Sequence, residues 1–456
     1  MLFTMPAPKP FYGVAAVPGD KSLGHRAWLA TLLGIGPCRI QGAPNNNDVN
    51  ATQACVEALG VSAHRLHENE WAVMSPPQLR VPQAPLDCCN AGTAMRLLAG
   101  LLVGLNIPAT LIGDASLSRR PMNRVLEPLT QMGAHINGTP HPDKPEIEVA
   151  PLTIQAISSG LRGCTYELPV ASAQVKSAIL LAGLFASETT TVVETIPSRD
   201  HTERLFQALG LPIAIQGQHI SVSGGWQRYF WPEGSQLIVG GDPSSAAFLL
   251  GAAAITPGSW VQVPGVLLNP TRLGWVKVLQ QWGVPLTIEP TGVGMGEPLG
   301  TLTAGCSMGY KAVLVGDVTL AAADIPALID ELPLLAVLAQ RVKGTLTVTG
   351  AEELRHKESD RIALMHQALE AVGGHFTPLK DGFVVVGDPE RVFYSPRQPL
   401  QTGHDHRVAM AMRVLNQACC PQQLWPLDDL ACVAVSFPTF EPILAQLQLA
   451  GPAVLP

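Results

Sequence analysis

Basic side chains collect at short stretches of this sequence that precede apolar runs. In PGDKSLGHRAWLA, Lys21, Ser22 and Arg26 share the start and first turn of an expected helix. The helix dipole disfavours cations there, but free backbone N–H groups and basic side chains together suit a phosphate ligand. The alternative interpretation of this stretch is a solvated helix end with incidental basic residues.

Two further stretches could bind anions. NAGTAMR is a glycine-containing loop leading into an apolar helix, and Gly92 would let a ligand approach the backbone. In SLSRRPM, Pro121 biases Arg120 toward an extended conformation that ends a strand. A simple helix cap and an exposed, solvated arginine pair are the alternatives.

Carboxylates accompany cations in the second half of the chain. LIDELP places Asp330 before an apolar helix, where an acid caps the helix or, near cations, acts as a base. KESDR places Lys357 and Arg361 four positions apart, able to share a helix face with Glu358 close by, although a salt-bridged exposed helix end also fits. GHDHR brings two histidines and an arginine to another helix start, but a zinc site would need a third ligand that is not evident.

The elements that must position these groups follow a repeat. A leucine-rich helical phrase, closed by a glycine and followed by a β-like run, ends at Gly60, Gly133, Gly210, Gly283, Gly373 and, weakly, Gly451. A glycine C-cap is typical of a helix that turns into a strand. The similar intervals predict six α/β units, although glycine-capped leucine-rich helices occur in any α/β protein.

A second class of expected helix begins with small residues, in GDKSLGHR, NAGTAMR, ASAQVKS and GDPSSAAF. Their free N–H groups would face an anion, and several such starts directed at one place would form a phosphate-binding cleft. Six units divide into three plus three, and we place the main domain boundary at residues 235–245.

Composition argues against several classes of protein. The 456 residues, 47% hydrophobic and 14% charged, predict two or three domains with large α/β cores and little disorder. The net charge of -7 argues against a nucleic-acid or anionic-membrane partner, and the apolar runs are shorter than the roughly 20 residues of a membrane span.

The cysteines and the N-terminal residues indicate the cellular compartment of the protein. Nine cysteines without a C-x-x-C pair predict reduced, packing thiols. The stretch MLFTMPAPKP has the features of neither a secretory signal nor a transit segment. We therefore expect a cytoplasmic protein.

Together these stretches resemble the 5-enolpyruvylshikimate-3-phosphate (EPSP) synthase family. PGDKS, NAGTAMR, RRP, SAQVKSA, SRDHTE, GDPSSAAF, LIDELP, KESDR and DHRVAMA occur in the family's order and approximate spacing over nearly the whole chain. The resemblance implies transfer of the enolpyruvyl group of phosphoenolpyruvate to the 5-hydroxyl of shikimate 3-phosphate, with release of phosphate, on the shikimate pathway to chorismate and aromatic amino acids. It further implies no metal or organic cofactor, a monomer, and inhibition by glyphosate at the phosphoenolpyruvate site.

The resemblance also implies a fold. The family is α/β, with two similar domains each of three βαβαββ units and the active site in the interdomain cleft. Its first strand belongs to the second domain. Residues 1–18 plus 240–456 are therefore expected to form one domain, and residues 19–239 the other, mainly on the shikimate-3-phosphate side.

Individual roles carry over from the family pattern. The residues expected to bind shikimate 3-phosphate are Lys21, Ser22, Arg26, Ser172, Gln174, Ser198, Asp330 and Lys357. Those expected to bind phosphoenolpyruvate are Lys21, Asn90, Gly92, Thr93, Arg120, Gln174, Arg361, His406 and Arg407. Asp330 is expected to deprotonate the 5-hydroxyl, Glu358 to protonate the methylene carbon, and Lys21 to assist proton transfer.

The sequence departs from the family pattern in places. Val435 stands where some members have a lysine, which puts one contact to the phosphoenolpyruvate phosphate in doubt. Cys89 stands where glycine is usual, Gly24 where serine or alanine is commoner, and Ala173 where some members have a second serine.

Two rival functions remain. A sister enolpyruvyl transferase that acts on a UDP-amino sugar shares the fold, but it uses a loop cysteine that LIGDASLSRRPM lacks, and it has neither KESDR nor DHR. A catalytically inactive six-unit scaffold would explain the repeats but not the retained cations and carboxylates.

Overall fold

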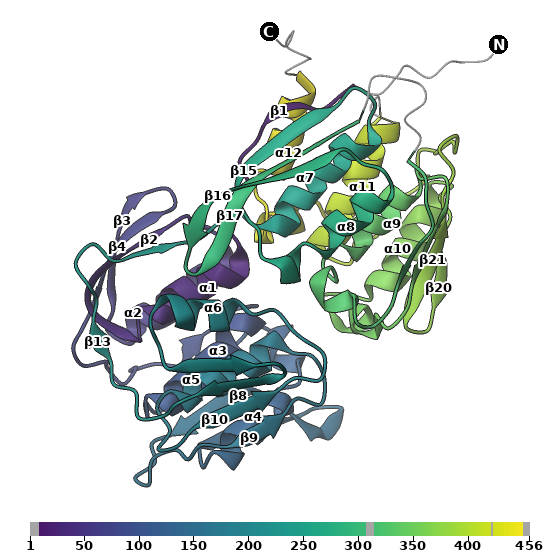
Figure 1. The fold of residues 1–456 in the computed structure, drawn as a ribbon. Coiled ribbons are helices and arrows are strands. Elements are labelled where there is room, and N and C mark those ends of the chain that lie inside the picture. The colour runs from purple at the N-terminus through teal and green to yellow at the C-terminus, as the bar shows by residue number, and fades with distance from the viewer. Residues whose placement is uncertain (1–8, 307–313, 421–422, 450–456) are drawn as a thin grey trace, which may run out of the picture. The chain divides into compact units, whose positions relative to one another are not determined.

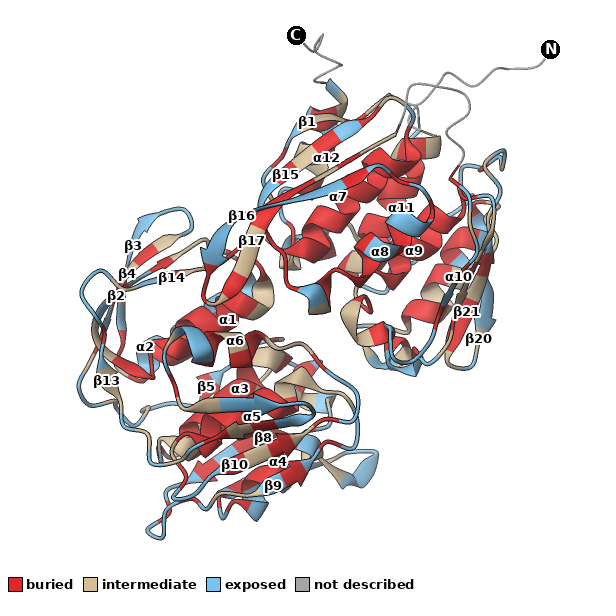
Figure 2. Ribbon diagram, viewed as in Figure 1, coloured by how far each residue is buried: buried red, intermediate tan, exposed pale blue. Residues whose placement is uncertain are grey.

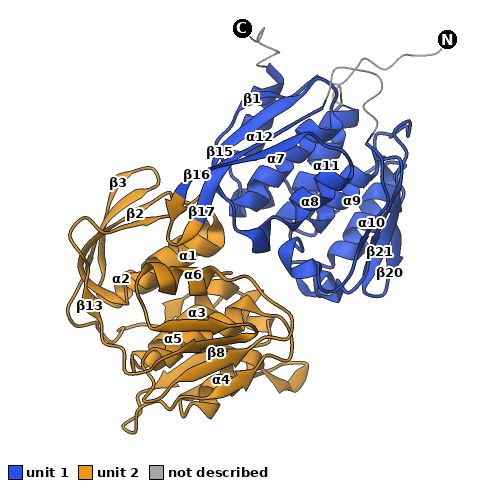
Figure 3. Cartoon of the chain, viewed as in Figure 1, with its two compact units in different colours: residues 1–18, 241–292, 298–456 blue, residues 19–240, 293–297 orange. Residues whose placement is uncertain are grey.

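The computed structural model describes residues 9–306, 314–420 and 423–449. It divides into two compact units (Figure 3). Unit 1 comprises the described residues up to Pro18, Gly241–Gly292 and those from Pro298 onward, and unit 2 comprises Gly19–Gly240 with Val293–Glu297.

Unit 2 contains three small sheets and six helices (Figure 1). Its sheets are ordered β14 (Gln236–Ile238), β2 (Gly34–Gln41), β4 (Glu70–Ser75), β3 (Ser62–His67); β5 (Leu86–Asp87), β6 (Ala109–Ile112), β8 (Lys144–Gln155), β7 (His135–His141); and β9 (Thr165–Glu167), β10 (Thr190–Val193), β12 (His219–Val222), β11 (Ile213–Gln216). A short strand, β13 (Tyr229–Phe230), also pairs with β2. The helices are α1 (Lys21–Ala30), α2 (Asn47–Ala58), α3 (Gly92–Gly104), α4 (Asn123–Gln131), α5 (Ala173–Gly183) and α6 (His201–Ala208).

Unit 1 repeats the same plan. Its sheets are ordered β1 (Tyr12–Val14), β15 (Trp260–Leu267), β17 (Glu297–Gly305), β16 (Leu286–Gly294); and β18 (Val318–Leu320), β19 (Thr345–Val348), β21 (Gly382–Val386), β20 (Thr377–Leu379). Its helices are α7 (Pro243–Ile255), α8 (Gly274–Gln281), α9 (Leu332–Ala339), α10 (Arg361–Ala371), α11 (His406–Cys419) and α12 (Phe440–Leu449). Short 3-10 helices are η1 (Leu117–Arg119), η2 (Pro270–Arg272), η3 (Ile325–Ala327), η4 (Glu352–His356) and η5 (Ala431–Val435).

Three of the sheets are contiguous βαβαββ units, formed by β5–β8, β9–β12 and β18–β21. In the other two sheets one edge strand comes from a distant part of the chain, because β1 pairs with β15 and β14 pairs with β2. In the third sheet of unit 2, β10 runs parallel to β9 with Val192 opposite Tyr166, and antiparallel to β12 with Val192 opposite Ile220. The parallel pair is connected through a helix and the last two strands form a hairpin, as these pairings require. The predicted α/β repeat is therefore visible in the backbone.

The glycine signal of the repeat is confirmed in five units. Gly60, Gly133, Gly210, Gly283 and Gly373 all have positive φ, between 66° and 104°. Each lies two positions after the last residue of a helix and precedes a strand, where the left-handed conformation favours glycine. Gly451 lies outside the described residues.

The sixth unit departs from the prediction of six similar units. In the described part of the chain, β21 is the last strand, and it ends at Val386. Beyond it, a single parallel bridge pairs Leu400 with Leu427, which lie on either side of α11 in the sequence. Helix α12 still occupies the place of the weak sixth phrase.

The four helices expected to begin with small residues, α1, α3, α5 and α7, lie among the central helices of the two units. Helices α1, α3 and α5 pack together in unit 2, as do α7, α9 and α11 in unit 1. Every residue of α7 and α9 is buried, and these central helices are largely red in Figure 2. Gly100 lets α3 approach α5 closely, because a Cβ there would lie 2.2 Å from the carbonyl oxygen of Ala178. Helices buried all round leave mainly their ends available for polar chemistry.

The cysteines and the helix lengths bear on two further expectations. All nine cysteines are free thiols, as predicted. Across the described ranges, no helix combines the length and the apolar character needed to span a bilayer.

Candidate active site

The start of α1 is capped by an aspartate. The Asp20 carboxylate accepts a hydrogen bond from the backbone N–H of Leu23 at 2.8 Å. Lys21, in the first turn, lies 3.0 Å from the Asp48 carboxylate. The acids therefore offset the unfavourable position of this cation at a helix N-terminus.

Arg26 is buried inside unit 2. Its Nε donates to Thr202 at 2.9 Å, and its two terminal nitrogens donate to the Ser22 carbonyl at 3.0 Å and to Ser177 at 2.8 Å. Burial lowers the pKa of Arg26 to about 10, with Glu203 acting in the opposite direction. The guanidinium thus remains a cation at neutral pH and links α1 to α5 and α6.

The loop before α3 is tied to the arginine that follows β6. Arg120 donates to the Asn90 side chain at 2.5 Å, and Asn90 donates to Asp114 at 2.7 Å. Arg120 is extended, as Pro121 predicts, with φ −80° and ψ 132°. The expectation that the arginine pair ends a strand is wrong, because β6 ends at Ile112 and η1 intervenes. The chain turns between them, where the Asp114 carboxylate accepts a hydrogen bond from the N–H of Leu117, the first residue of η1.

Gly92 lies against two guanidinium groups. A Cβ at this position would lie 2.9 Å from a terminal nitrogen of Arg96 and 3.3 Å from one of Arg120. The backbone of Gly92 has no left-handed conformation, so a methyl group there would mainly displace the ends of these two arginine side chains.

The starts of α3 and α5 are joined by Gln174. Its side chain accepts from Arg96 at 2.7 Å and donates to Thr93 at 2.8 Å. Ser172 caps α5 by accepting from the N–H of Val175 at 3.4 Å. Candidate residues of both predicted substrate sites are therefore adjacent within unit 2.

Ser198 is buried in the loop between β10 and α6. Its hydroxyl donates to Glu194 at 2.5 Å, and Glu194 lies 2.7 Å from Lys176. Lys176 also pairs with Glu203 at 2.5 Å. Burial raises the pKa of Glu203, and the nearby Lys176 acts in the opposite direction.

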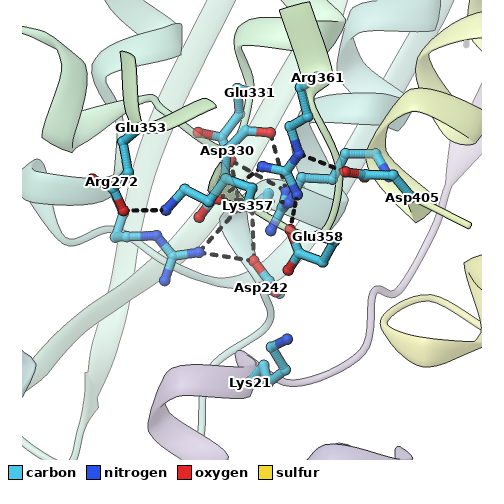
Figure 4. Close-up of polar contacts among 12 residues, drawn as sticks. Lys21, Asp242, Arg272, Asp330, Glu331, Glu353, Lys357, Glu358, Arg361 and Asp405 are labelled. Carbon is cyan, nitrogen blue, oxygen red and sulfur yellow. Dashed lines mark hydrogen bonds and ion pairs between the residues drawn. The ribbon is translucent and has the colours of Figure 1, made fainter. Parts of the chain in front are cut away.

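Arg361 is the centre of a charged cluster in unit 1 (Figure 4). Its side chain is 1% exposed and lies 2.8 Å from Asp405, 2.5 Å from Glu358 and 3.6 Å from Asp330. Burial opposes the charge, but Glu358 and then Asp405 outweigh it and raise the pKa of Arg361 above its ordinary value. The first turn of α10 thus holds a fixed cation beside both predicted catalytic carboxylates.

Asp330 and Glu331 are adjacent in sequence but differ in exposure. Arg407 lies 3.6 Å from the Asp330 carboxylate, whose side chain is 16% exposed. The Glu331 side chain is 1% exposed and accepts a hydrogen bond from Ser244. Burial and the charge of Asp330 raise the pKa of Glu331. Asp330 is therefore the more accessible of the two acids.

Lys357 does not share a helix face with Arg361, and that expectation is wrong. Asp360 accepts from the N–H of Ala363 at 3.0 Å and caps α10, so the helix begins only at Arg361. Lys357 follows η4 and pairs with Glu353 at 2.8 Å.

His406 is the first residue of α11 and is buried. Asp405 caps this helix by accepting from the N–H of Arg407 at 2.9 Å. Among the residues that the model describes, the single group with the spacing of metal ligands is Asp200, His201 and Glu297, so neither histidine of GHDHR belongs to one. Arg204 already pairs with Asp200 at 2.8 Å in that group.

Several polar partners were not predicted. Lys176 and Ser177 lie within SAQVKSA, where a lysine and a serine inside an otherwise apolar helix were an available signal. Their partners Glu194, Glu203 and Thr202 had no local signal, because they come from other elements. In unit 1, Arg272 pairs with Asp242 at 3.1 Å, before the start of α7.

Comparisons with known proteins agree with these motifs. Residues 6–444 match the family model described as EPSP synthase (3-phosphoshikimate 1-carboxyvinyltransferase). A 3-phosphoshikimate 1-carboxyvinyltransferase of Anaeromyxobacter sp. (strain Fw109-5) is 42% identical over 436 residues, covering 95% of this chain and 96% of that protein. One of Chloroflexus aurantiacus is 42% identical over 450 residues, covering 98% and 99%.

Solved structures extend the comparison to the fold. An EPSP synthase from Acinetobacter baumannii has a TM-score of 0.84 and 36% identity, covering 97% of each chain. The enolpyruvyl transferase NikO from Streptomyces tendae has a TM-score of 0.69 at 17% identity, covering 97% of this chain and 96% of that one, a likeness of fold alone. The predicted α/β enolpyruvyl transferase fold is confirmed, and the chain belongs to the EPSP synthase family.

Proposed function

We propose that this chain transfers the enolpyruvyl group of phosphoenolpyruvate to the 5-hydroxyl of shikimate 3-phosphate and releases phosphate. The observation that carries the proposal is the cluster around Arg361, where one buried cation contacts both Glu358 and Asp330. Two carboxylates and a fixed cation are what an addition with two proton transfers and a growing negative charge requires.

The proposed chemistry gives the two acids different tasks. Asp330 accepts the proton of the 5-hydroxyl while the hydroxyl oxygen bonds to the central carbon of phosphoenolpyruvate. Glu358 donates a proton to the methylene carbon. The resulting tetrahedral ketal phosphate then expels phosphate while the methyl group returns a proton to Glu358. Lys21 assists proton transfer, and the arginines stabilise the negative charge of carboxylate and phosphate.

The binding roles divide between the two units. We propose that unit 2 holds mainly shikimate 3-phosphate, through Lys21, Ser22, Arg26, Ser172, Gln174 and Ser198, with Asp330 and Lys357 from unit 1. Asn90, Gly92, Thr93, Arg120, Arg361, His406 and Arg407 serve phosphoenolpyruvate, together with Lys21 and Gln174. The support is the family membership and the contacts described for each residue within its own unit.

The setting is also proposed from the family resemblance. We infer a monomer in the cytoplasm that needs no metal or organic cofactor and has no nucleic-acid or membrane partner. The net charge of -7 agrees with the lack of a nucleic-acid partner.

A phosphate-release assay tests the proposed reaction. The purified chain should release phosphate from phosphoenolpyruvate only when shikimate 3-phosphate is also present, with one enolpyruvyl product per phosphate. Release that depends on a UDP-amino sugar instead would favour the sister enolpyruvyl transferase. No release with either acceptor would favour an inactive scaffold.

Arg120→Ala should weaken phosphoenolpyruvate binding by about 1.5–3 kcal/mol, the scale of a hydrogen bond to a charged group. Shikimate 3-phosphate binding should be nearly unchanged, and titration of each ligand separately measures both values. Arg124→Ala removes an exposed arginine of the same segment and is the matched control. Equal losses for the two ligands would remove Arg120 from the phosphoenolpyruvate site.

Gly92→Ala should raise the ratio of the glyphosate inhibition constant to the KM of phosphoenolpyruvate. The added methyl would displace the guanidinium ends of Arg96 and Arg120, which lie 2.9 and 3.3 Å from it. We expect the longer inhibitor to lose more than the substrate, with overpacking of roughly 1–3 kcal/mol as the scale. Steady-state inhibition at several phosphoenolpyruvate concentrations measures the ratio. An unchanged ratio would mean that Gly92 does not line the site.

A further inference from the structure

A buried lysine in unit 2 has no part in the chemistry proposed above. Lys176 lies one turn along α5 from the cap residue Ser172, and its backbone N–H donates to the Ser172 carbonyl at 3.0 Å. Its side chain is 1% exposed and pairs with Glu194 at 2.7 Å and with Glu203 at 2.5 Å. A buried ion cluster of this kind is often no more stabilising than well-packed apolar residues, so stability alone is a weak reason for it.

The cluster connects three elements that carry candidate substrate ligands. Glu194 follows β10 and its second oxygen accepts from both the hydroxyl of Ser198 at 2.5 Å and the backbone N–H of Ser198 at 3.3 Å. Glu203 lies in the first turn of α6, next to Thr202, which accepts from Arg26. Lys176 therefore links the start of α5 to the Ser198 loop and to the start of α6.

The hydrogen-bond direction at Ser198 adds a chemical constraint. A serine hydroxyl has one proton, and an ionised carboxylate only accepts, so the Ser198 proton is directed at Glu194. A phosphate dianion also only accepts hydrogen bonds. Ser198 must therefore turn its proton away from Glu194 to bind a phosphate. Glu194 then loses one partner, and the ammonium of Lys176 still balances its charge.

We propose that Lys176 is a positioning residue for the phosphate end of shikimate 3-phosphate. Through Glu194 and Glu203 it holds the Ser198 loop and the start of α6 against α5, and it keeps Glu194 paired when the Ser198 hydroxyl turns to the phosphate. This inference rests on the proposed function of the chain and adds a residue to the same site.

Lys176→Met tests the inference by removing the ammonium while keeping most of the side-chain volume. The KM of shikimate 3-phosphate should rise about tenfold or more, because a hydrogen bond to a charged group is lost from its supporting residues. The kcat and the KM of phosphoenolpyruvate should change by less than about threefold, since Lys176 acts only through the phosphate end. Lys144→Met, an exposed lysine on β8 of the same unit, is the control that should leave all three values unchanged.

A second variant separates positioning from folding. Lys176→Met leaves two buried carboxylates with one cation fewer, so it also destabilises unit 2. Lys176→Met/Glu203→Gln removes one carboxylate charge as well and should regain much of the lost thermal stability. The raised KM of shikimate 3-phosphate should persist in this double variant, because Glu194 still lacks its cation. A KM that returns to the original value along with stability would overturn the inference.

A double-mutant cycle with Ser198→Ala tests whether Lys176 affects shikimate 3-phosphate binding through Ser198. If Lys176 acts through Ser198, Lys176→Met should raise the KM of shikimate 3-phosphate much less in the Ser198→Ala background. An equal rise in both backgrounds would contradict the inference. A parent chain that releases no phosphate with shikimate 3-phosphate would instead contradict the proposed function, so the two failures are distinguishable.

Discussion

Glu358→Gln is expected to lower kcat by about a hundredfold or more, the scale of a lost general acid. The amide keeps the size of the side chain and can still accept from Arg361, which lies 2.5 Å from the carboxylate. It has no transferable proton for the methylene carbon of phosphoenolpyruvate. The KM values of both substrates should therefore stay within about threefold of the parent values.

The matched control for this variant is Glu352→Gln, an exposed acid in the first turn of η4. It removes the same charge from the same segment and should leave kcat unchanged. Single-turnover measurement of phosphate release isolates the chemical step from product release. Near-normal turnover by Glu358→Gln would remove Glu358 from the mechanism, whereas equal losses in the two variants would point to a general charge effect.

Arg361→Met is expected to destabilise unit 1 by about 3–5 kcal/mol, the range for removing one partner of a buried ion pair. The reason is Asp405, whose side chain is 0% exposed and lies 2.8 Å from the Arg361 guanidinium. Without the arginine this carboxylate remains buried without its cation, and Glu358 and Asp330 lose the same cation. Phosphoenolpyruvate binding should fall in the same variant, because the proposed cation of its site is removed.

Hydrogen exchange measures the loss locally. Peptides that cover α10 and α11 should exchange faster in Arg361→Met, while peptides of α3 in unit 2 provide an internal reference. Arg355→Met is the control, because its pair with Asp360 is more exposed at both ends and should contribute no more than about 1 kcal/mol. Equal exchange of α11 in the parent chain and in Arg361→Met would show that Asp405 does not depend on this cation.

The candidate site was only partly predictable from the sequence. The motifs brought out Arg361, Glu358 and Asp330, and the model groups these three side chains within unit 1. The motifs placed Glu358 near Arg361 but did not predict Asp405 as its buried partner, and the helix face predicted for Lys357 is wrong. Asp360 accounts for that error, because this capping residue lies immediately before Arg361, so the helix starts at Arg361 and leaves Lys357 outside it.

The burial of charged side chains in unit 2 was likewise only partly predictable from the sequence. The sequence predicted Arg26 as a cation at a helix start, and the model buries its guanidinium against α5 and α6. Lys176 had only a weak signal, a basic residue in an apolar helix, and its partners lie 18 and 27 positions further along the chain. The exposure and pairing of these cations depend on helices and loops that are distant from them in the sequence.

The sequence by itself determined local features, namely where helices start and end. Helix starts with Asp20, Ser172 and Asp405, and helix ends with glycines such as Gly133, need only hydrogen bonds and backbone conformations within about four residues, so they can be predicted from short stretches. The tertiary structure decided which of the resulting ends meet. Pairs such as Arg361 with Asp405 and Lys176 with Glu194 form only after central helices have packed, because burial removes water as the competing partner and leaves the neighbouring element to satisfy the charge.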